Sequence, residues 1–242
     1  MSIARYMSYK RAKLDFDSVA EIYDALPIES NNDHSTFFVN MPRNTRHALD
    51  VGCGTGNFLM HMHNKFDYLV GMDISNNMIN VARRKIYTAG IGNCNFVIGD
   101  AENLPFAYEK FDFVFSHTML HHCPNLFSTL VGLKKLVASQ GKLVLIDILD
   151  ASLTGFSPIL SMNVIAFLDI LKSMLFSPAI FFKRKYLGVP REWNLHQMRE
   201  CFYSQEEVYN AAGEIFPGVK LQTYFSEFFL TRFVKIEWDN LE

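Results

Sequence analysis

Cysteine is scarce in this sequence of 242 residues, and no two cysteines have the spacing of a metal or redox motif. The four stand far apart in the chain and form no C-x-x-C pair: Cys53, Cys94, Cys123 and Cys201. Scattered thiols of this kind are typical of proteins in reducing compartments. The sequence therefore argues against disulfide bonds and against a cysteine-bound metal, and we expect a cytoplasmic protein without a metal ion.

Positive charge is also not in excess. Lysine and arginine number 23 against 25 aspartates and glutamates, which gives a formal net charge of −2. Domains that bind nucleic acid usually carry a basic patch, so we expect no nucleic-acid partner. Residues 1–14 are basic, but no apolar segment follows them. They therefore do not form a secretory signal, and we expect them to be loosely held.

Long hydrophobic runs are limited to one region. Residues 151–168 carry no charge and approach the length of a membrane span, but Gly155 and Pro158 interrupt them and Asp169 follows. We therefore expect no transmembrane span. Residues 151–203 instead predict a very apolar helical insertion, which could act as a substrate lid or as a homodimer interface. Peripheral contact with a membrane is compatible with the same composition.

A glycine-rich turn joins a predicted strand, residues 46–51, to a helix that begins near Phe58. The turn contains three glycines at alternate positions, Gly52, Gly54 and Gly56. Glycine lets a ligand approach the bare backbone and tolerates positive φ. About 20 residues further on, Asp73 ends the next apolar run, where its carboxylate can accept hydrogen bonds from both hydroxyls of a ribose. The pattern predicts a nucleoside-binding site.

The spacing of the glycines distinguishes between nucleoside cofactors. Folds that bind dinucleotides carry G-x-G-x-x-G and place a pyrophosphate on the helix N-terminus, whereas this chain has G-x-G-x-G preceded by Asp50. An acid at that position suits a cationic amino group better than a pyrophosphate, which disfavours an NAD-dependent oxidoreductase. Residues 50–56 resemble the first motif of class I S-adenosylmethionine-dependent methyltransferases. The resemblance implies S-adenosyl-L-methionine as cofactor and S-adenosyl-L-homocysteine as product.

Strands and helices alternate along the rest of the core. After the first strand, further strands are predicted at 68–72, 95–98, 111–116 and 142–148. The helices between them include one capped by Ser75 or Asn76 and one at 125–138, and near-continuous apolar strands of this kind predict a parallel sheet with helices on both faces. A helix at 205–215 and strands at 219–224 and 228–235 end the chain. By resemblance, the fold class is α/β, a Rossmann-like seven-stranded methyltransferase sheet with five parallel strands and a C-terminal antiparallel hairpin.

The chain is expected to divide into four parts: N-terminal cap helices at 1–45, a cofactor-binding core at 46–150, the apolar insertion at 151–203, and a final helix and hairpin at 204–242. Within the first part, Phe16 to Asp24 resembles the F-D-x-V-A-x-x-Y-D opening of quinone-biosynthesis methyltransferases. The resemblance implies a short lid helix that brings Tyr23 to the methionine end of the cofactor. A plain docking helix is the alternative.

Several polar residues fall at the carboxyl ends of predicted strands, where parallel sheets bind their ligands. The resemblance assigns cofactor binding to these residues: Tyr23, Asp50, Gly52, Cys53, Gly54, Gly56, Asp73, Ile74, Met78, Asp100, Ala101, Ser116 and His117. Asp100 would accept a hydrogen bond from the adenine amine, and the backbone amide of Ala101 would donate to the adenine ring. For Asp100, a turn-forming role is the alternative.

Three histidines are candidate general bases. His121 and His122 follow the fourth strand, and His196 lies in the insertion. Histidine has an unperturbed pKa near 6.5, so it can take a proton from a substrate hydroxyl or amine; for His121 and His122, a structural role in bonding a helix end is the alternative. Asp147, at the end of the fifth strand, could meet substrate or cap a turn. We expect methyl transfer to O, N or C of an apolar or amphipathic small molecule, or a relative that binds the cofactor without methylating.

Overall fold

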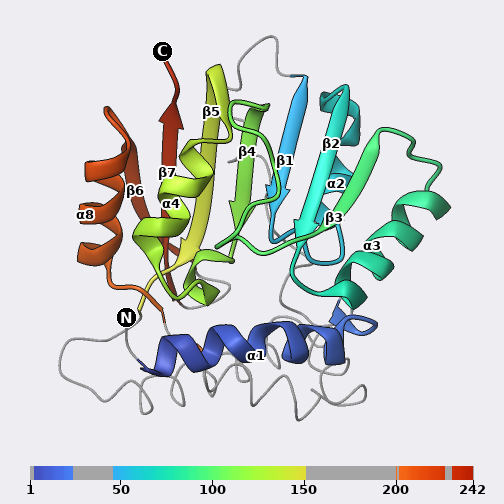
Figure 1. Ribbon diagram of the computed structural model, residues 1–242, viewed down its shortest axis with the longest axis horizontal. Helices are drawn as coiled ribbons and strands as arrows, with labels where there is room; N and C mark the ends of the chain where they lie inside the picture. The colour runs from blue at the N-terminus through green and yellow to red at the C-terminus, as the bar shows by residue number, and fades with distance from the viewer. Residues whose placement is uncertain (1–2, 24–45, 151–199, 201, 227–230, 242) are drawn as a thin grey trace.

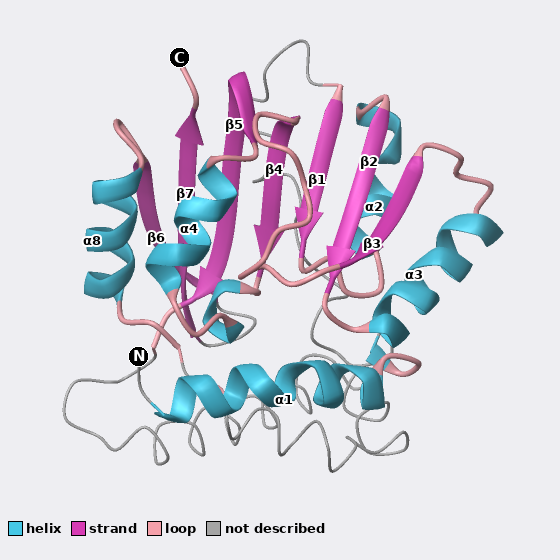
Figure 2. Cartoon of the chain, in the orientation of Figure 1, coloured by secondary structure: helices cyan, strands magenta, loops and turns pink. Residues whose placement is uncertain are grey.

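The computed structural model describes residues 3–23, 46–150, 200, 202–226 and 231–241 (Figure 1). The predictions for the insertion, including His196, therefore lie outside the described residues. Within the described part, strands form a single sheet with helices packed against it (Figure 2). No helix among these residues is both long and apolar enough to cross a membrane.

Seven strands form the sheet in the order β3-β2-β1-β4-β5-β7-β6 (Figure 1). The first five in this order pair in parallel, and β7 pairs antiparallel with both β5 and β6. The prediction of five parallel strands followed by an antiparallel hairpin is confirmed. The strands are β1 (His47–Val51), β2 (Tyr68–Asp73), β3 (Cys94–Ile98), β4 (Phe111–His117), β5 (Val137–Ile148), β6 (Lys220–Ser226) and β7 (Thr231–Asp239).

Side-chain caps hold the starts of some of the described helices. Ser75 accepts a hydrogen bond from the backbone of Met78, and Ser204 forms the predicted capping box with Glu207. Among the described residues, the helices and short 3-10 helices are α1 (Ile3–Val19), α2 (Asn57–Met62), η3 (His63–Lys65), α3 (Asn76–Thr88), η4 (Leu120–His122), α4 (Leu126–Lys134) and α8 (Gln205–Ile215).

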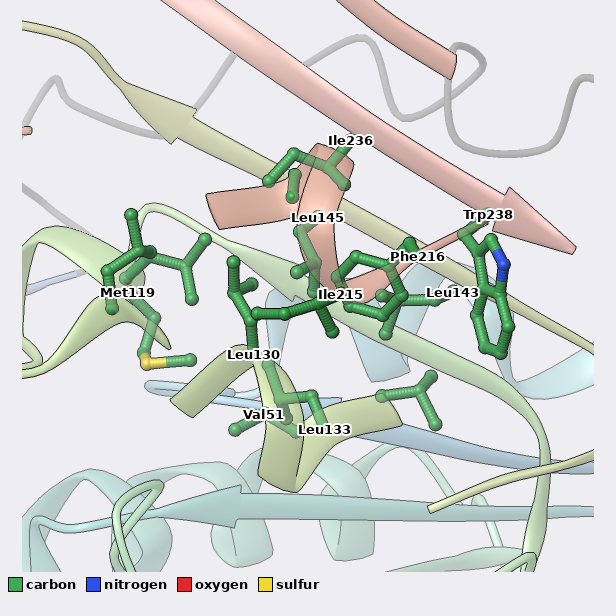
Figure 3. Close-up of a cluster of buried hydrophobic side chains, with 14 of the residues drawn as sticks. Val51, Met119, Leu130, Leu133, Leu143, Leu145, Ile215, Phe216, Ile236 and Trp238 are labelled. Carbon is green, nitrogen blue, oxygen red and sulfur yellow. The ribbon is translucent and has the colours of Figure 1, made fainter. Parts of the chain in front are cut away.

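Successive residues of a strand point to opposite sides of the sheet, and buried clusters with helices cover both sides. Leu143 and Leu145 of β5 join one buried cluster with α4 and α8, and Figure 3 shows these side chains meeting. Val144 and Ile146 join a second cluster, together with residues of α2 and α3. Each of these buried side chains contributes about 1.5–3 kcal/mol of hydrophobic stabilisation. The packing fixes the strands, and their carboxyl ends form one edge.

The N-terminal segment is more regular than the sequence predicts. Residues 1–14 were expected to be loosely held and a short helix was expected from Phe16, whereas α1 is a single helix from Ile3 to Val19. Ala12 is buried, at 3% exposed. The prediction was wrong because the partners of this helix are far away in the sequence. Figure 1 shows α1 lying across the ends of the parallel strands.

The boundary between α4 and β5 also differs from the prediction. A helix was expected over 125–138 and a strand over 142–148, but β5 begins at Val137, which pairs with Phe111 of β4. The register then shifts, and Gln140 adopts φ +62 within this irregular stretch. The Gln-Gly pair that was expected to separate the helix from the strand is therefore an irregularity inside one long strand.

Candidate active site

A cavity lies between α1 and the carboxyl ends of β1, β2 and β4. Tyr9, Ala12 and Phe16 of α1 form one wall, and residues of the loops that follow these strands form the others. Parallel sheets bind ligands at this edge. The predicted site residues that line the cavity are Tyr23, Gly52, Cys53, Gly54, Asp73, Ile74, Met78, Asp100, Ala101, His117 and His122.

Asp73 ends β2 at the cavity and is held by the backbone of two loops. Its Oδ2 atom accepts a hydrogen bond from Gly54 N at 2.9 Å, and its Oδ1 atom accepts one from Ser75 N at 2.8 Å. Burial raises the pKa of this carboxyl to about 6, because the hydrogen bonds that it accepts from the backbone only partly offset desolvation. Asp73 is therefore mainly ionised at neutral pH and can accept hydrogen bonds from a ligand.

The glycine turn has the backbone that its sequence predicts. Gly52 and Gly54 have φ values of +77° and +52°, and a Cβ on Gly52 would lie 2.6 Å from Cγ of Met119. Gly56 does not line the cavity; a Cβ there would lie 3.1 Å from Cβ of Ala82, so this glycine lets α2 approach α3. Its predicted contact with cofactor stays a prediction.

Asp100 lines the cavity and is bonded to the helix that covers it. The Tyr9 hydroxyl donates to Oδ2 of Asp100 at 2.5 Å, while Oδ1 accepts from the backbone of Glu102 at 3.0 Å. Burial and the Asp100 carboxylate raise the pKa of Tyr9, so its hydroxyl stays protonated. The adenine-binding role predicted for Asp100 therefore places the ligand amine in competition with Tyr9.

Contacts at both ends hold α1 over the cavity. Near its start, Arg5 forms an ion pair with Glu207 at 3.0 Å, and its guanidinium carbon lies 3.9 Å from the centre of the Tyr203 ring. Near its end, Oδ1 of Asp17 accepts a hydrogen bond from Ser75 Oγ at 2.5 Å. The helix thus spans from α8 to α3 and closes the carboxyl edge of the sheet.

Three predicted site residues lie behind the cavity wall. Asp50 is buried within β1, where it pairs with Gly71. The Ser116 hydroxyl donates to the Val51 carbonyl at 2.6 Å and so joins β4 to the end of β1. His121 is also buried and does not line the cavity. A direct contact of these residues with a ligand stays a prediction.

The two adjacent histidines of η4 have different surroundings. His121 Nδ1 lies 2.5 Å from Oδ1 of Asp147. Burial alone would lower the pKa of His121, but the carboxylates of Asp147 and Glu200 raise it to about 10, so the ring is protonated at neutral pH. His122 lines the cavity, with its ring 3.9 Å from that of His121 and 5.2 Å from that of Phe16. Of the two rings, His122 is therefore the one that a ligand can reach.

Sequence reasoning missed several lining residues. In α1, Tyr9, Ala12 and Phe16 follow the i, i+3, i+7 spacing of one helix face, and this periodicity was a usable signal. After β4, Thr118 and Met119 also line the cavity. Thr118 adopts φ +53, which is unusual for a β-branched residue, and no sequence pattern indicated it.

Comparison with known proteins agrees with this geometry. A family profile described as "Methyltransferase domain" matches residues 49–145. Demethylmenaquinone methyltransferase of Bacillus velezensis is 30% identical over 112 residues, which cover 45% of this chain and 48% of that protein. The enzyme of the same name from Staphylococcus saprophyticus is 34% identical over 103 residues, covering 41% and 43%. The chain thus spans less than half the length of these curated relatives.

Solved structures share the fold at low sequence identity. Phosphoethanolamine N-methyltransferase 2 of Haemonchus contortus, in complex with phosphomonomethylethanolamine and S-adenosylhomocysteine, superposes with a TM-score of 0.67 at 13% identity, covering 97% of this chain and 59% of that one. A possible histamine N-methyltransferase from Thermotoga maritima gives 0.58 at 18% identity, covering 94% and 99%. Residues 49–145 thus match a methyltransferase domain, and the chain shares the fold of these solved methyltransferases.

Proposed function

We propose that this protein binds S-adenosylmethionine between α1 and the sheet and transfers its methyl group to an apolar or amphipathic small molecule. The observation that carries the proposal is the meeting of Asp73, Asp100 and the glycine turn in one cavity. A Cβ on Gly54 would meet only Tyr23 Cε1, at 3.9 Å, so ligand atoms fit against this backbone. A carboxylate for the ribose, one for the adenine and a bare turn match the groups of this cofactor.

The bound cofactor supplies a methyl group that its sulfonium already activates. The chain has to hold the acceptor in line with that group at about 3–3.5 Å and to exclude water. α1 covers the cavity and is tied at both ends, which supports the exclusion of water. His122 and Met119 lie on the wall that follows β4 and present an imidazole and an apolar surface to an acceptor.

The names of the relatives support one class of acceptor. Two curated proteins that match this chain are named demethylmenaquinone methyltransferases, and we infer an aromatic, quinol-like acceptor. An apolar wall that includes Phe16 and Met119 suits such a ring. The acceptor hydroxyl would need to lose a proton. His122, which lies next to Phe16 at this wall, is the candidate base.

Two measurements test the proposed function. Calorimetry should show binding of S-adenosylmethionine and S-adenosylhomocysteine but not of NAD, and preferential NAD binding would overturn the assignment. Transfer of a labelled methyl group should then be followed into reduced naphthoquinones, with phosphoethanolamine and histamine as alternative acceptors. Binding without transfer to any acceptor would favour a relative that keeps the pocket and does not methylate.

The affinity for S-adenosylmethionine is expected to fall in acid. The pKa of Asp73 is about 6 in the free protein, and ribose hydroxyls bond the ionised form, so a proton competes with the ligand. The dissociation constant should be constant above neutral pH and about fourfold larger at pH 5.5. Calorimetry across this range measures it, and Asp73→Asn should give a weak but flat profile. A rise in affinity toward acid would contradict the assigned role.

Replacing Tyr9 with phenylalanine is expected to tighten cofactor binding. The Tyr9 hydroxyl must give up its hydrogen bond to Asp100 if the adenine amine is to take its place. A bond worth about 1 kcal/mol corresponds to about a fivefold gain in affinity. Tyr6→Phe, at an exposed position of the same helix, is the matched control. Weaker binding by Tyr9→Phe would instead show that the hydroxyl belongs to the ligand-bound site.

A further inference from the structure

Three side chains that can bind a metal meet beside the cavity, and one of them, His122, is part of its wall. His121, His122 and Glu200 each offer one ligand atom, and these atoms all lie within 4.8 Å of one another. The two histidines come from η4, and Glu200 comes from a distant part of the chain. Among the described residues, this is the one group of three histidine, cysteine or acidic side chains with such a geometry.

The orientation of His121 is that of a metal ligand. Its Nδ1 atom is occupied by the Asp147 carboxylate at 2.5 Å, and its backbone N–H donates to the other Asp147 oxygen at 3.2 Å. This leaves Nε2, which lies 3.9 Å from Oε1 of Glu200. Histidines that bind metals usually donate their second ring N–H to a carboxylate, which fixes the ring and the tautomer.

The separation and burial of these atoms fit a metal ion. Ligands of a tetrahedral zinc ion, at about 2.0–2.1 Å from the metal, lie about 3.4 Å apart. The 3.9 Å between His121 Nε2 and Glu200 Oε1 is within a small side-chain adjustment of that value. The side chains of His121 and Glu200 are only 3% and 14% exposed. Within the cluster, the carboxylates of Asp147 and Glu200 lie at the two nitrogens of the His121 imidazole, and a bound metal ion would replace the proton that Nε2 otherwise carries.

We propose that His121, His122 and Glu200 bind a divalent transition-metal ion, with Asp147 as the residue that orients His121. Two imidazoles and one carboxylate suit zinc or cobalt better than magnesium. Three protein ligands leave the fourth coordination position of a tetrahedral ion open. Because His122 lines the cavity, the site would lie at the cavity wall. The sequence predicted no metal because it shows no ligand motif; the third ligand is far from the other two in the chain.

The role of the metal rests on the proposed function, whereas its binding does not. At the cavity wall, an open coordination position could take the hydroxyl oxygen of an acceptor and favour its deprotonation. The same cluster without a metal would be a structural one, in which a protonated His121 lies between Asp147 and Glu200. The metal site and the metal-free structural cluster differ in whether the protein binds a metal ion at all.

Cobalt titration tests the binding directly. The full chain, stripped with a chelator, should bind one equivalent of Co²⁺ with visible ligand-field absorption, and Zn²⁺ should displace it. Glu200→Gln and His122→Ala should weaken binding by more than tenfold, and Asp147→Asn by about 10–100-fold. Glu206→Gln, at an exposed position of α8, should leave binding unchanged. Circular dichroism checks that each variant is folded.

The outcomes separate this inference from the proposed function. Absence of the cobalt absorption in the wild-type chain, or absorption that survives in both Glu200→Gln and His122→Ala, would overturn the metal site. Calorimetry with S-adenosylmethionine on the same metal-free protein reports on the proposed function independently. Cofactor binding without metal binding refutes only the metal site, and metal binding without cofactor binding refutes only the proposed function.

Discussion

Replacing Asp73 with alanine is expected to weaken the binding of S-adenosylmethionine by about 100-fold. Two hydrogen bonds from ribose hydroxyls to an ionised carboxylate contribute about 1.5 kcal/mol each, and about 1.4 kcal/mol corresponds to a factor of ten. The same carboxylate accepts hydrogen bonds from the backbones of Gly54 and Ser75, so its loss also frees the two loops that shape the cavity. Calorimetry with the purified variant measures the effect.

Asp67→Ala is the matched control for this variant. Asp67 precedes the same strand at its opposite end and is exposed in an ion pair with Arg46 at 2.6 Å. Its replacement should leave cofactor affinity unchanged. Asp73→Asn keeps one acceptor oxygen for the backbone, and its cofactor affinity should lie between those of the wild type and Asp73→Ala. An affinity for Asp73→Ala equal to that of the wild type would refute the placement of the ribose at this carboxylate.

The sheet and half of the site could be predicted because their signals are local. The apolar runs that became β1, β2 and β4 are buried on both faces, and their polar residues stand at or next to the strand ends. The apolar side predicted for the helix after Ser75 is buried in α3, including Ile79 and Ala82. Gly54 lies in the turn after β1 and Asp73 ends β2, so their position at the carboxyl edge follows from the strand assignment alone.

The rest of the site depends on contacts between residues that are far apart in the sequence. Tyr9 meets Asp100, and His121 meets both Asp147 and Glu200. None of these three contacts has a sequence spacing that a pattern can recognise. The helix α1 was underestimated for the same reason: its stability comes from packing and polar contacts on α3 and α8 rather than from its own composition.

Replacing Gly52 with alanine is expected to destabilise the protein by about 3 kcal/mol. A residue with a Cβ at φ +77° is strained by about 1–3 kcal/mol. The new Cβ would also lie 2.6 Å from Cγ and 2.8 Å from Cβ of Met119, so that side chain would have to move. Met119 lines the cavity, and its displacement should therefore reduce cofactor affinity as well. Denaturant unfolding and calorimetry measure the two effects.

Two further glycines separate the causes of this loss. Gly90 has φ +70°, but a Cβ there would meet nothing within 4 Å, so Gly90→Ala should show the backbone strain alone, at about 1 kcal/mol. Gly92 has neither a positive φ nor a near neighbour, and Gly92→Ala should be close to neutral. The difference between Gly52→Ala and Gly90→Ala then measures the overlap with Met119. Equal losses at these two positions would mean that Met119 moves without cost and that strain alone requires glycine at the turn.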